Sequence, residues 1–224
     1  LFSAIADAAA DPQATDFSRV LHFPNPENFI RRIDISHHET INSWNDIIKA
    51  GVTEVYMKVT EGVGTYDRMA ATFARDAKAA GLKIGYYHFG RPDSRATGTV
   101  TGDALAEAKD YLDTIAKLPA WDLPLALDLE EADPWETPLS PADYLLWLKT
   151  FLPAIESPGK PMPYIYSRKS YLEPKLPANH GLGARYPLWL ARYHIDARQA
   201  RTIAGWNRWT AWQFSDIGKL GTND

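Results

Sequence analysis

The chain has 224 residues, a length that fits one domain the size of an α/β barrel. Its net charge is −4, from 24 Lys and Arg against 28 Asp and Glu, so it offers no basic surface for nucleic acid. The absence of cysteine excludes disulfides and thiolate metal sites, and no apolar run approaches the roughly 18 residues that a membrane span requires.

Residues 1–30 are predicted to form an N-terminal extension, followed by a single barrel domain over residues 31–224. The Ala-rich start has no initiator Met and no basic segment, so it is consistent with the remainder of a processed signal. Pro24-Asn25-Pro26 disfavours regular structure. We therefore leave this stretch out of the fold prediction, and we expect an extracellular or cell-envelope location.

From residue 31 onward, short strand-like runs alternate with helical patterns. Strands are expected over residues 31–36, 54–60, 83–89, 123–129 and 162–167, and helices over 41–51, 73–81, 105–115 and 141–151. Residues 186–193 and 208–214 are also strand-like, with little room for a helix between them. This alternation indicates βα units on a parallel sheet, so we predict an α/β barrel that loses its helices towards the C-terminus.

The fourth strand carries the clearest chemical signal. It runs through apolar residues into Asp128 and Glu130, and alternation along a strand places these two acids on the same face. Because like charges at this spacing oppose joint ionisation, one pKa should rise and the pair can divide the acid and base roles. The alternative is a solvated loop after the strand, with Asp128 capping or in an ion pair.

Other predicted strands also end in polar or aromatic groups. They are Asp34, Glu61, Tyr87, His88, Tyr166, Trp189 and Gln213. Active sites of barrels gather at the carboxyl ends of the strands. Acids and aromatics at successive strand ends therefore favour an enzyme over a set of unrelated solvated side chains.

Each of these residues also has a structural interpretation. Asp34 could brace the loop after its strand, and Glu61 could order its own loop. Tyr87 is assigned to the site and Tyr86 to the core, although the reverse register is open. His88 is interpreted as a hydrogen-bonded barrel residue rather than a catalyst. The adjacent His37 and His38 are weak evidence for a metal site, because a site needs further ligands.

Six short motifs follow one another along the chain: Ile33-Asp34-Ile35-Ser36-His37, Lys58-Val59-Thr60-Glu61-Gly62, Gly85-Tyr86-Tyr87-His88-Phe89, Leu127-Asp128-Leu129-Glu130, Leu188-Trp189-Leu190-Ala191-Arg192-Tyr193 and Trp212-Gln213-Phe214-Ser215. In this order they resemble glycoside hydrolase family 25, the Chalaropsis-type lysozymes or N-acetylmuramidases. The resemblance implies a TIM-barrel-like (β/α)5(β)3 fold. It also implies hydrolysis of the β-1,4 bond between N-acetylmuramic acid and N-acetylglucosamine in peptidoglycan, without a metal or organic cofactor.

Carried over residue by residue, the resemblance makes Glu130 the general acid. Asp128 would steer the substrate's 2-acetamido group as it attacks the anomeric carbon, a substrate-assisted retaining route. Asp34 would line the same pocket. The expected sugar-binding residues are Tyr87, Tyr166, Trp189 and Gln213, because the apolar face of a pyranose packs well on aromatic rings.

The sequence departs from the family at two places. His38-Glu39 stand where relatives often have Trp followed by Gln or Asn. The tail after Ser215 is short, so that either Asp224 supplies the family's late substrate-binding acid or that element is missing. Two other functions stay open, a glycan-binding barrel without turnover and a glycosidase acting on chitin-like polymers. Retention of both Asp128 and Glu130 favours the enzyme, which we expect to be a monomer.

Overall fold

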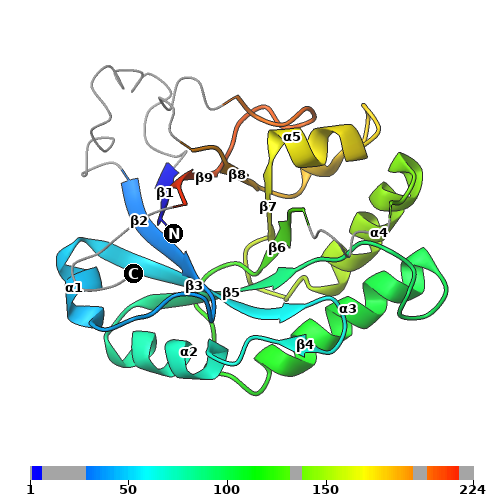
Figure 1. Ribbon diagram of the computed structural model, residues 1–224. Helices are drawn as coiled ribbons and strands as arrows, with labels where there is room; N and C mark the ends of the chain where they lie inside the picture. The colour runs from blue at the N-terminus through cyan, green and yellow to red at the C-terminus, as the bar shows by residue number, and fades with distance from the viewer. Residues whose placement is uncertain (1, 7–28, 132–137, 194–200, 217–224) are drawn as a thin grey trace.

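The computed structural model describes residues 2–6, 29–131, 138–193 and 201–216. In these ranges the chain forms a curved sheet with helices on its outer side (Figure 1). The strands are β1 (Phe2–Ala6), β2 (Phe29–Ile35), β3 (Val52–Glu61), β4 (Thr65–Tyr66), β5 (Lys83–Phe89), β6 (Ala126–Leu129), β7 (Tyr164–Arg168), β8 (Leu188–Ala191) and β9 (Ala211–Ser215).

The sheet closes on itself as a barrel. Its strand order is β2-β1-β9-β8-β7-β6-β5-β3-β4, and an additional pairing of β2 with β3 completes the ring. Neighbouring strands from β2 through β3, β5, β6, β7 and β8 to β9 are parallel. The prediction of a TIM-barrel-like α/β fold is therefore confirmed.

The structure differs from the prediction at the N-terminus. Phe2–Ala6, assigned to the extension, forms β1 and pairs antiparallel with both β2 and β9. An Ala-rich segment has a weak intrinsic strand preference, but it fills the gap between the first and last parallel strands, and this tertiary context outweighs propensity. The start of the barrel domain at residue 31 otherwise stays a prediction, because residues 7–28 lie outside the described ranges.

The helices follow the parallel strands in turn. They are α1 (Trp44–Lys49), α2 (Ala70–Ala79), α3 (Val100–Ile115), α4 (Pro141–Ala154) and the single turn α5 (Lys169–Leu172), with 3-10 turns at Glu173–Lys175 and Leu182–Ala184. Three of them begin at side-chain caps, where Ser43, Thr99 and Ser140 each accept a hydrogen bond from a backbone N–H of the first turn. Within the described residues, no helix combines the length and hydropathy needed to cross a bilayer.

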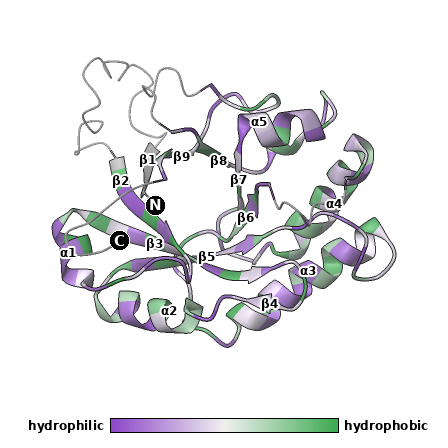
Figure 2. Cartoon of the chain, in the orientation of Figure 1, coloured by the Kyte–Doolittle hydropathy of each residue, from purple (hydrophilic) through white to green (hydrophobic). Residues whose placement is uncertain are grey.

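Two apolar cores result from this arrangement. The larger one lies between the sheet and the helices. Each helix carries both hydrophobic and hydrophilic residues, as expected for helices that cover a sheet (Figure 2). The smaller one fills the barrel interior and includes Tyr56, Ala126, Tyr164, Tyr166 and Trp189. Along each strand, residues of the outer core therefore alternate with residues that point into the barrel. The candidate site is formed by inward-pointing residues.

The barrel interior also holds a buried ion pair. Arg32 on β2 donates to Glu54 on β3 from Nε at 3.1 Å and from a terminal nitrogen at 2.5 Å, and both side chains are almost fully buried. The guanidinium carbon lies 4.7 Å from the centroid of the Tyr56 ring and 5.4 Å from that of Trp189. Cation–π contacts thus add to the ion pair where water is excluded.

Candidate active site

Asp128 and Glu130 lie on the inner side of the barrel, as the alternation predicts. Leu127 and Leu129 belong to the outer core, whereas Ala126 belongs to the inner one, so Asp128 points inward. Asp128 is 5% exposed. Glu130 follows the last residue of β6, is partly buried, and acts on Asp128 through its charge. Two carboxyl groups therefore share the carboxyl end of one strand.

Burial and mutual repulsion alter the titration of both acids. Burial raises the pKa of Asp128 well above its ordinary value, and the charge of Glu130 adds to this rise while Lys58 opposes it. Burial also raises the pKa of Glu130, with a further rise from Asp34 and a reduction from Arg168. The two carboxyl groups therefore titrate as a pair, and the pair retains protons to higher pH than isolated carboxyl groups would.

Asp34 joins the pair from β2, and Gln213 holds it there. The Gln213 side chain donates from Nε2 to both carboxylate oxygens of Asp34, at 2.9 Å each. Its Oε1 accepts hydrogen bonds from the hydroxyls of Tyr166 and Tyr193, both at 2.7 Å. These hydrogen bonds of Gln213 connect β9 with β2, with β7 and with the residues after β8, around the acids.

The two tyrosines of β5 divide as predicted. Tyr86 is fully buried in the outer core and donates from its hydroxyl to the carbonyl of Pro119 at 2.7 Å. Tyr87 is half-buried and packs against the inner core. Burial, followed by the charges of Asp128 and Asp34, raises its pKa well above 10, so the phenol is neutral beside the acids.

Trp189 and Gln213, which were expected among the sugar-binding residues, are almost completely buried. Trp189 is 2% exposed and its ring centroid lies 4.9 Å from that of Tyr56, while Gln213 is fully buried. Gln213 contacts Asp34 directly and Trp189 packs against Tyr166, so both hold groups of the site in place. Their contact with a bound sugar stays a prediction. Tyr193, half-buried and two positions beyond Ala191 on the inner face, was missed, although the alternation Trp189, Ala191, Tyr193 could have indicated it.

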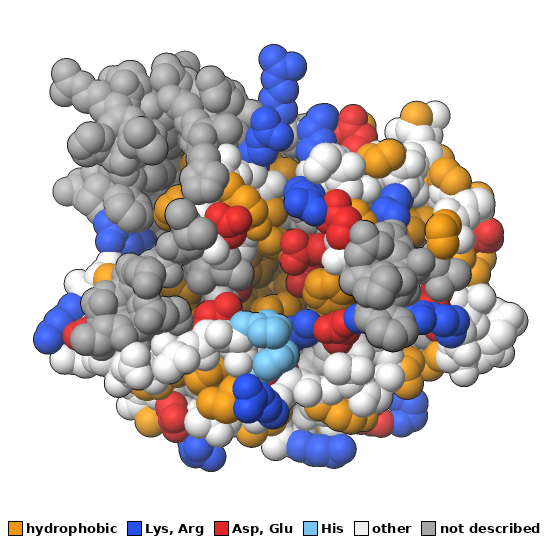
Figure 3. Space-filling view, in the orientation of Figure 1, with side chains coloured by type: hydrophobic (Ala, Val, Ile, Leu, Met, Phe, Trp, Pro, Cys, Tyr) orange, Lys and Arg blue, Asp and Glu red, His pale blue; other side chains and the backbone are white. Residues whose placement is uncertain are grey.

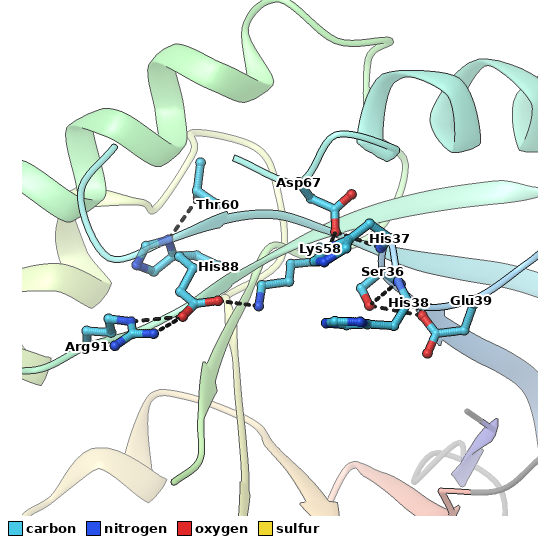
Figure 4. Close-up of polar contacts among 10 residues, drawn as sticks. Ser36, His37, His38, Glu39, Lys58, Thr60, Asp67, His88 and Arg91 are labelled. Carbon is cyan, nitrogen blue, oxygen red and sulfur yellow. Dashed lines mark hydrogen bonds and ion pairs between the residues drawn. The ribbon is translucent and has the colours of Figure 1, made fainter. Parts of the chain in front are cut away.

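A second charged group, also missed as a unit, lies at the end of β3 (Figure 4). Lys58 donates from Nζ to Glu61 Oε2 at 2.5 Å, and Arg91 donates from Nε to Glu61 Oε1 at 2.9 Å. Burial alone would raise the pKa of Glu61, but hydrogen bonds and charges from Lys58 and Arg91 leave it below its ordinary value. Glu61 is therefore ionised and anchors two cations.

His88 is a structural residue, as interpreted from the sequence. It is fully buried, with Nδ1 2.8 Å from Thr60 Oγ1 and Nε2 2.7 Å from Glu107 Oε2. Its ring stacks on Phe151 with the centroids 5.1 Å apart. Both ring nitrogens are thus occupied on the helix side of the sheet, away from the acids.

The residues that depart from the family pattern occupy the loop after β2. The His37 Nδ1 atom lies 2.9 Å from Asp67 Oδ2, and the rings of His37 and His38 are 3.9 Å apart (Figure 4). Glu39 accepts a hydrogen bond from the backbone N–H of Ser36 at 2.6 Å. Among the described residues no group of three or more His, Cys, Asp and Glu side chains is arranged to hold a metal ion. Asp224 lies outside these residues.

Two hollows in the described surface bear on the choice of site. Near the centre of one face, acidic and hydrophobic side chains surround a hollow with histidine side chains at its edge (Figure 3). A second depression, of about 440 Å³, is lined by residues around Glu61, Arg91 and Arg95. In this second depression Arg91 is paired with Glu61 and Arg95 with Asp93. Its other two acids are engaged as well, Asp103 by the Trp147 side chain and Glu107 by His88. The inward-facing acids therefore remain the better candidate for chemistry.

A closed barrel with acids converging at the carboxyl ends of its strands defines the class of TIM-barrel-like enzymes. Residues 33–222 match the glycosyl hydrolases family 25, and the chain belongs to that family.

Relatives named as lysozymes share much of the chain. Lysozyme M1 of Streptomyces globisporus is 26% identical over 200 residues, which cover 88% of this chain but only 66% of the relative. A bacterial lysozyme from Streptomyces coelicolor superposes with a TM-score of 0.74 at 25% identity, covering 87% of each chain. A family GH25 lysozyme from Aspergillus fumigatus gives a TM-score of 0.69 at 31% identity, covering 85% of this chain and 89% of that one.

Proposed function

We propose that this protein is a lysozyme that hydrolyses the β-1,4 bond between N-acetylmuramic acid and N-acetylglucosamine in peptidoglycan. The observation that carries the proposal is the buried pair of Asp128 and Glu130 facing Asp34 inside the barrel. Membership of family 25 and the lysozyme names of the relatives support the same substrate. Such a protein acts where peptidoglycan lies, in the cell envelope or outside the cell, and we expect it to act as a monomer.

Glu130 is the general acid in this proposal. Its raised pKa allows it to hold a proton at a pH where an ordinary glutamate is ionised. It donates this proton to the glycosidic oxygen as the bond from that oxygen to the anomeric carbon breaks. The carboxylate left behind later accepts a proton from the attacking water, so the residue returns to its starting state.

Asp128 prepares the substrate for a retaining reaction. Its carboxylate accepts a hydrogen bond from the N–H of the 2-acetamido group, whose carbonyl oxygen bonds to the anomeric carbon as the leaving group departs. Water then attacks this carbon and the acetamido group is restored. Because the two carboxyl groups titrate as a pair, a hydrogen bond from the acetamido N–H to Asp128 favours the ionised form of Asp128 and leaves the proton on Glu130.

The remaining residues shape the pocket. Tyr87 and Tyr166 present aromatic surface to the sugar, and Asp34 contacts it or adjusts the charge of the pair. Trp189 packs against Tyr166 and Gln213 orients Asp34, and we expect both to contribute to the sugar-binding pocket. A role for Asp224 in binding stays a prediction.

The experiment compares clearing of a peptidoglycan suspension by the wild type and by Glu130→Gln. Loss of the acid should lower the rate by about 10²–10⁴-fold, the usual contribution of general acid catalysis. Equal clearing by both proteins would remove the catalytic assignment, and binding without clearing by the wild type would indicate a glycan-binding barrel. Release of chitin oligomers without wall lysis would indicate a chitin-type glycosidase, and mass spectrometry of defined muropeptides identifies the new reducing sugar.

A further inference from the structure

One oxygen of the catalytic pair lacks a partner. Asp128 Oδ1 is buried and has no hydrogen bond within the described part of the chain. A buried carboxylate oxygen without a donor is unfavourable unless a nearby charge compensates it. The charged and titratable groups that face Asp128 come from four other elements and its own: Lys58 of β3, Tyr87 of β5, Tyr166 of β7, Asp34 of β2 and Glu130 after β6.

Lys58 is the cation among these groups. Its Cα pairs with Tyr87 across β3 and β5, and its side chain is 13% exposed. The ammonium nitrogen lies 4.6 Å from the centroid of the Phe89 ring, and Phe89 is the strand partner of Asp128 across β5 and β6. The side chain thus extends towards the end of β5, where the acid pair lies, and its positive charge acts on Asp128.

Glu61 fixes the position of this ammonium group. One carboxylate oxygen accepts from Lys58 and the other accepts from Arg91, so the Glu61 carboxylate is held from both sides. The three side chains together carry a net charge of +1. The contact with Glu61 already restricts the rotamers of the flexible lysine side chain. Holding the ammonium group near the acids therefore costs less additional conformational entropy than it would for an unpaired lysine.

We propose that Lys58, anchored by Glu61, is a positioning residue that stabilises the ionised form of Asp128 during the reaction. This inference rests on the proposed lysozyme function, in which Asp128 accepts a hydrogen bond from the substrate's acetamido N–H. Three acids, Asp34, Asp128 and Glu130, share one region of low polarity, and without a cation at most one of them could ionise readily. Lys58 allows the pair to keep one proton rather than two.

The inference predicts a shift of the pH–rate profile rather than a simple loss of activity. The active form holds one proton on the pair, so kcat/KM follows a bell-shaped curve set by the two macroscopic pKa values. Lys58→Met removes the charge and retains the length of the side chain. Both limbs of the curve should move to higher pH by about one unit or more, which is the usual effect of losing an opposite charge nearby. Lys58→Arg should restore the wild-type position.

A structural role for Lys58 predicts a different result. If Lys58 only orders the loop through Glu61, Lys58→Met lowers the curve at every pH without moving it, and the proposal is overturned. Lys109→Met is the matched control, since Lys109 pairs with Asp113 on the exposed face of α3. That variant should leave the curve unchanged.

A second measurement does not depend on turnover. The ¹³C chemical shift of the Asp128 carboxyl carbon can be followed against pH in the wild type and in Lys58→Met. A midpoint that rises by about one unit in the variant supports the inference, and an unchanged midpoint overturns it. Failure of the wild type to clear peptidoglycan would refute the proposed function instead, and the two failures are therefore distinguishable.

Discussion

Gln213 binds Asp34 through both carboxylate oxygens, although 179 positions separate the two residues in the sequence. The two lie on β9 and β2, which sit on either side of β1 in the barrel. The amide cannot turn over, because its oxygen accepts from Tyr166 and Tyr193 while its nitrogen faces the acid. A neutral side chain thus orients Asp34 without competing with the catalytic pair for protons.

Gln213→Glu should destabilise the protein, and the loss should grow with pH. The introduced carboxyl is fully buried opposite Asp34, so its pKa in the folded state is raised above the unfolded value. Its contribution is therefore least unfavourable below about pH 4, the ordinary pKa of Glu, and stability is lost as the pH rises towards the raised folded-state pKa. We expect a loss of about 3 kcal/mol at pH 7, measured by urea unfolding at several pH values.

Gln213→Met is the control for this prediction. It removes the hydrogen bonds to Asp34 and those from the two tyrosines and adds no charge, so its cost should vary much less with pH. Parallel pH curves for the two variants would contradict the like-charge explanation.

Tyr166 and Tyr193 should show a positive coupling in a double-mutant cycle. Each phenol has one proton, and both protons are donated to Oε1 of Gln213. Tyr166→Phe or Tyr193→Phe alone leaves this buried oxygen one donor, whereas the double variant leaves it none. The double variant should therefore lose about 1 kcal/mol more unfolding free energy than the sum of the single variants. Additive losses in urea unfolding would mean that the two hydroxyls act independently.

The sequence predicted best what depends on strand alternation. The inward side of Asp128, and the division of Tyr86 from Tyr87, follow from the period of two along a strand. Alternation does not report depth within a barrel, and for this reason the almost complete burial of Trp189 and Gln213 could not be predicted from it. Strand β1 was missed because its place is created by the distant strands that it joins.

The charged neighbours of the acid pair were harder to predict. Lys58 was visible only as part of a short motif, and its direction depends on the register of β3 against β5, which shifts between Lys58 and Thr60. Such an irregularity re-aims side chains locally and leaves no clear mark in one sequence. The contact of Arg91 with Glu61 likewise joins the loop after β5 to the end of β3, and its geometry is set by the whole barrel end.

Asp128→Asn should abolish most activity but raise thermal stability at neutral pH. The folded-state pKa of Asp128 is raised by burial, so the wild-type carboxyl is least unfavourable below its unfolded pKa and destabilises the fold as pH rises. An amide does not titrate, and the advantage of the variant should grow from pH 4 to pH 7. A gain of ~1 kcal/mol would raise Tm by about 2–4 °C for a domain of this size.

Asp113→Asn provides the matched control for the Asp128 variant. Asp113 is exposed on α3 and forms an ion pair with the exposed Lys109. The effect of Asp113→Asn on the unfolding free energy should therefore stay within about 0.5 kcal/mol. The quantity to compare is the Tm of Asp128→Asn minus the Tm of the wild type at each pH. If this difference is smaller at pH 7 than at pH 4, the surroundings stabilise the ionised Asp128 and the prediction is contradicted.

Arg32→Met should destabilise the barrel more than removal of both members of its ion pair. Arg32 and Glu54 are 3% and 4% exposed, so loss of the guanidinium leaves a buried carboxylate without its cation. We expect a cost of about 3–5 kcal/mol at pH 7, and Arg32→Met combined with Glu54→Leu should recover most of it, because an apolar pair needs no compensating charge. The cation–π contacts with Tyr56 and Trp189 are lost in both variants, so they do not explain the difference between them. Urea unfolding of the two single variants and the double variant measures this coupling, and a double variant less stable than Arg32→Met alone would refute it.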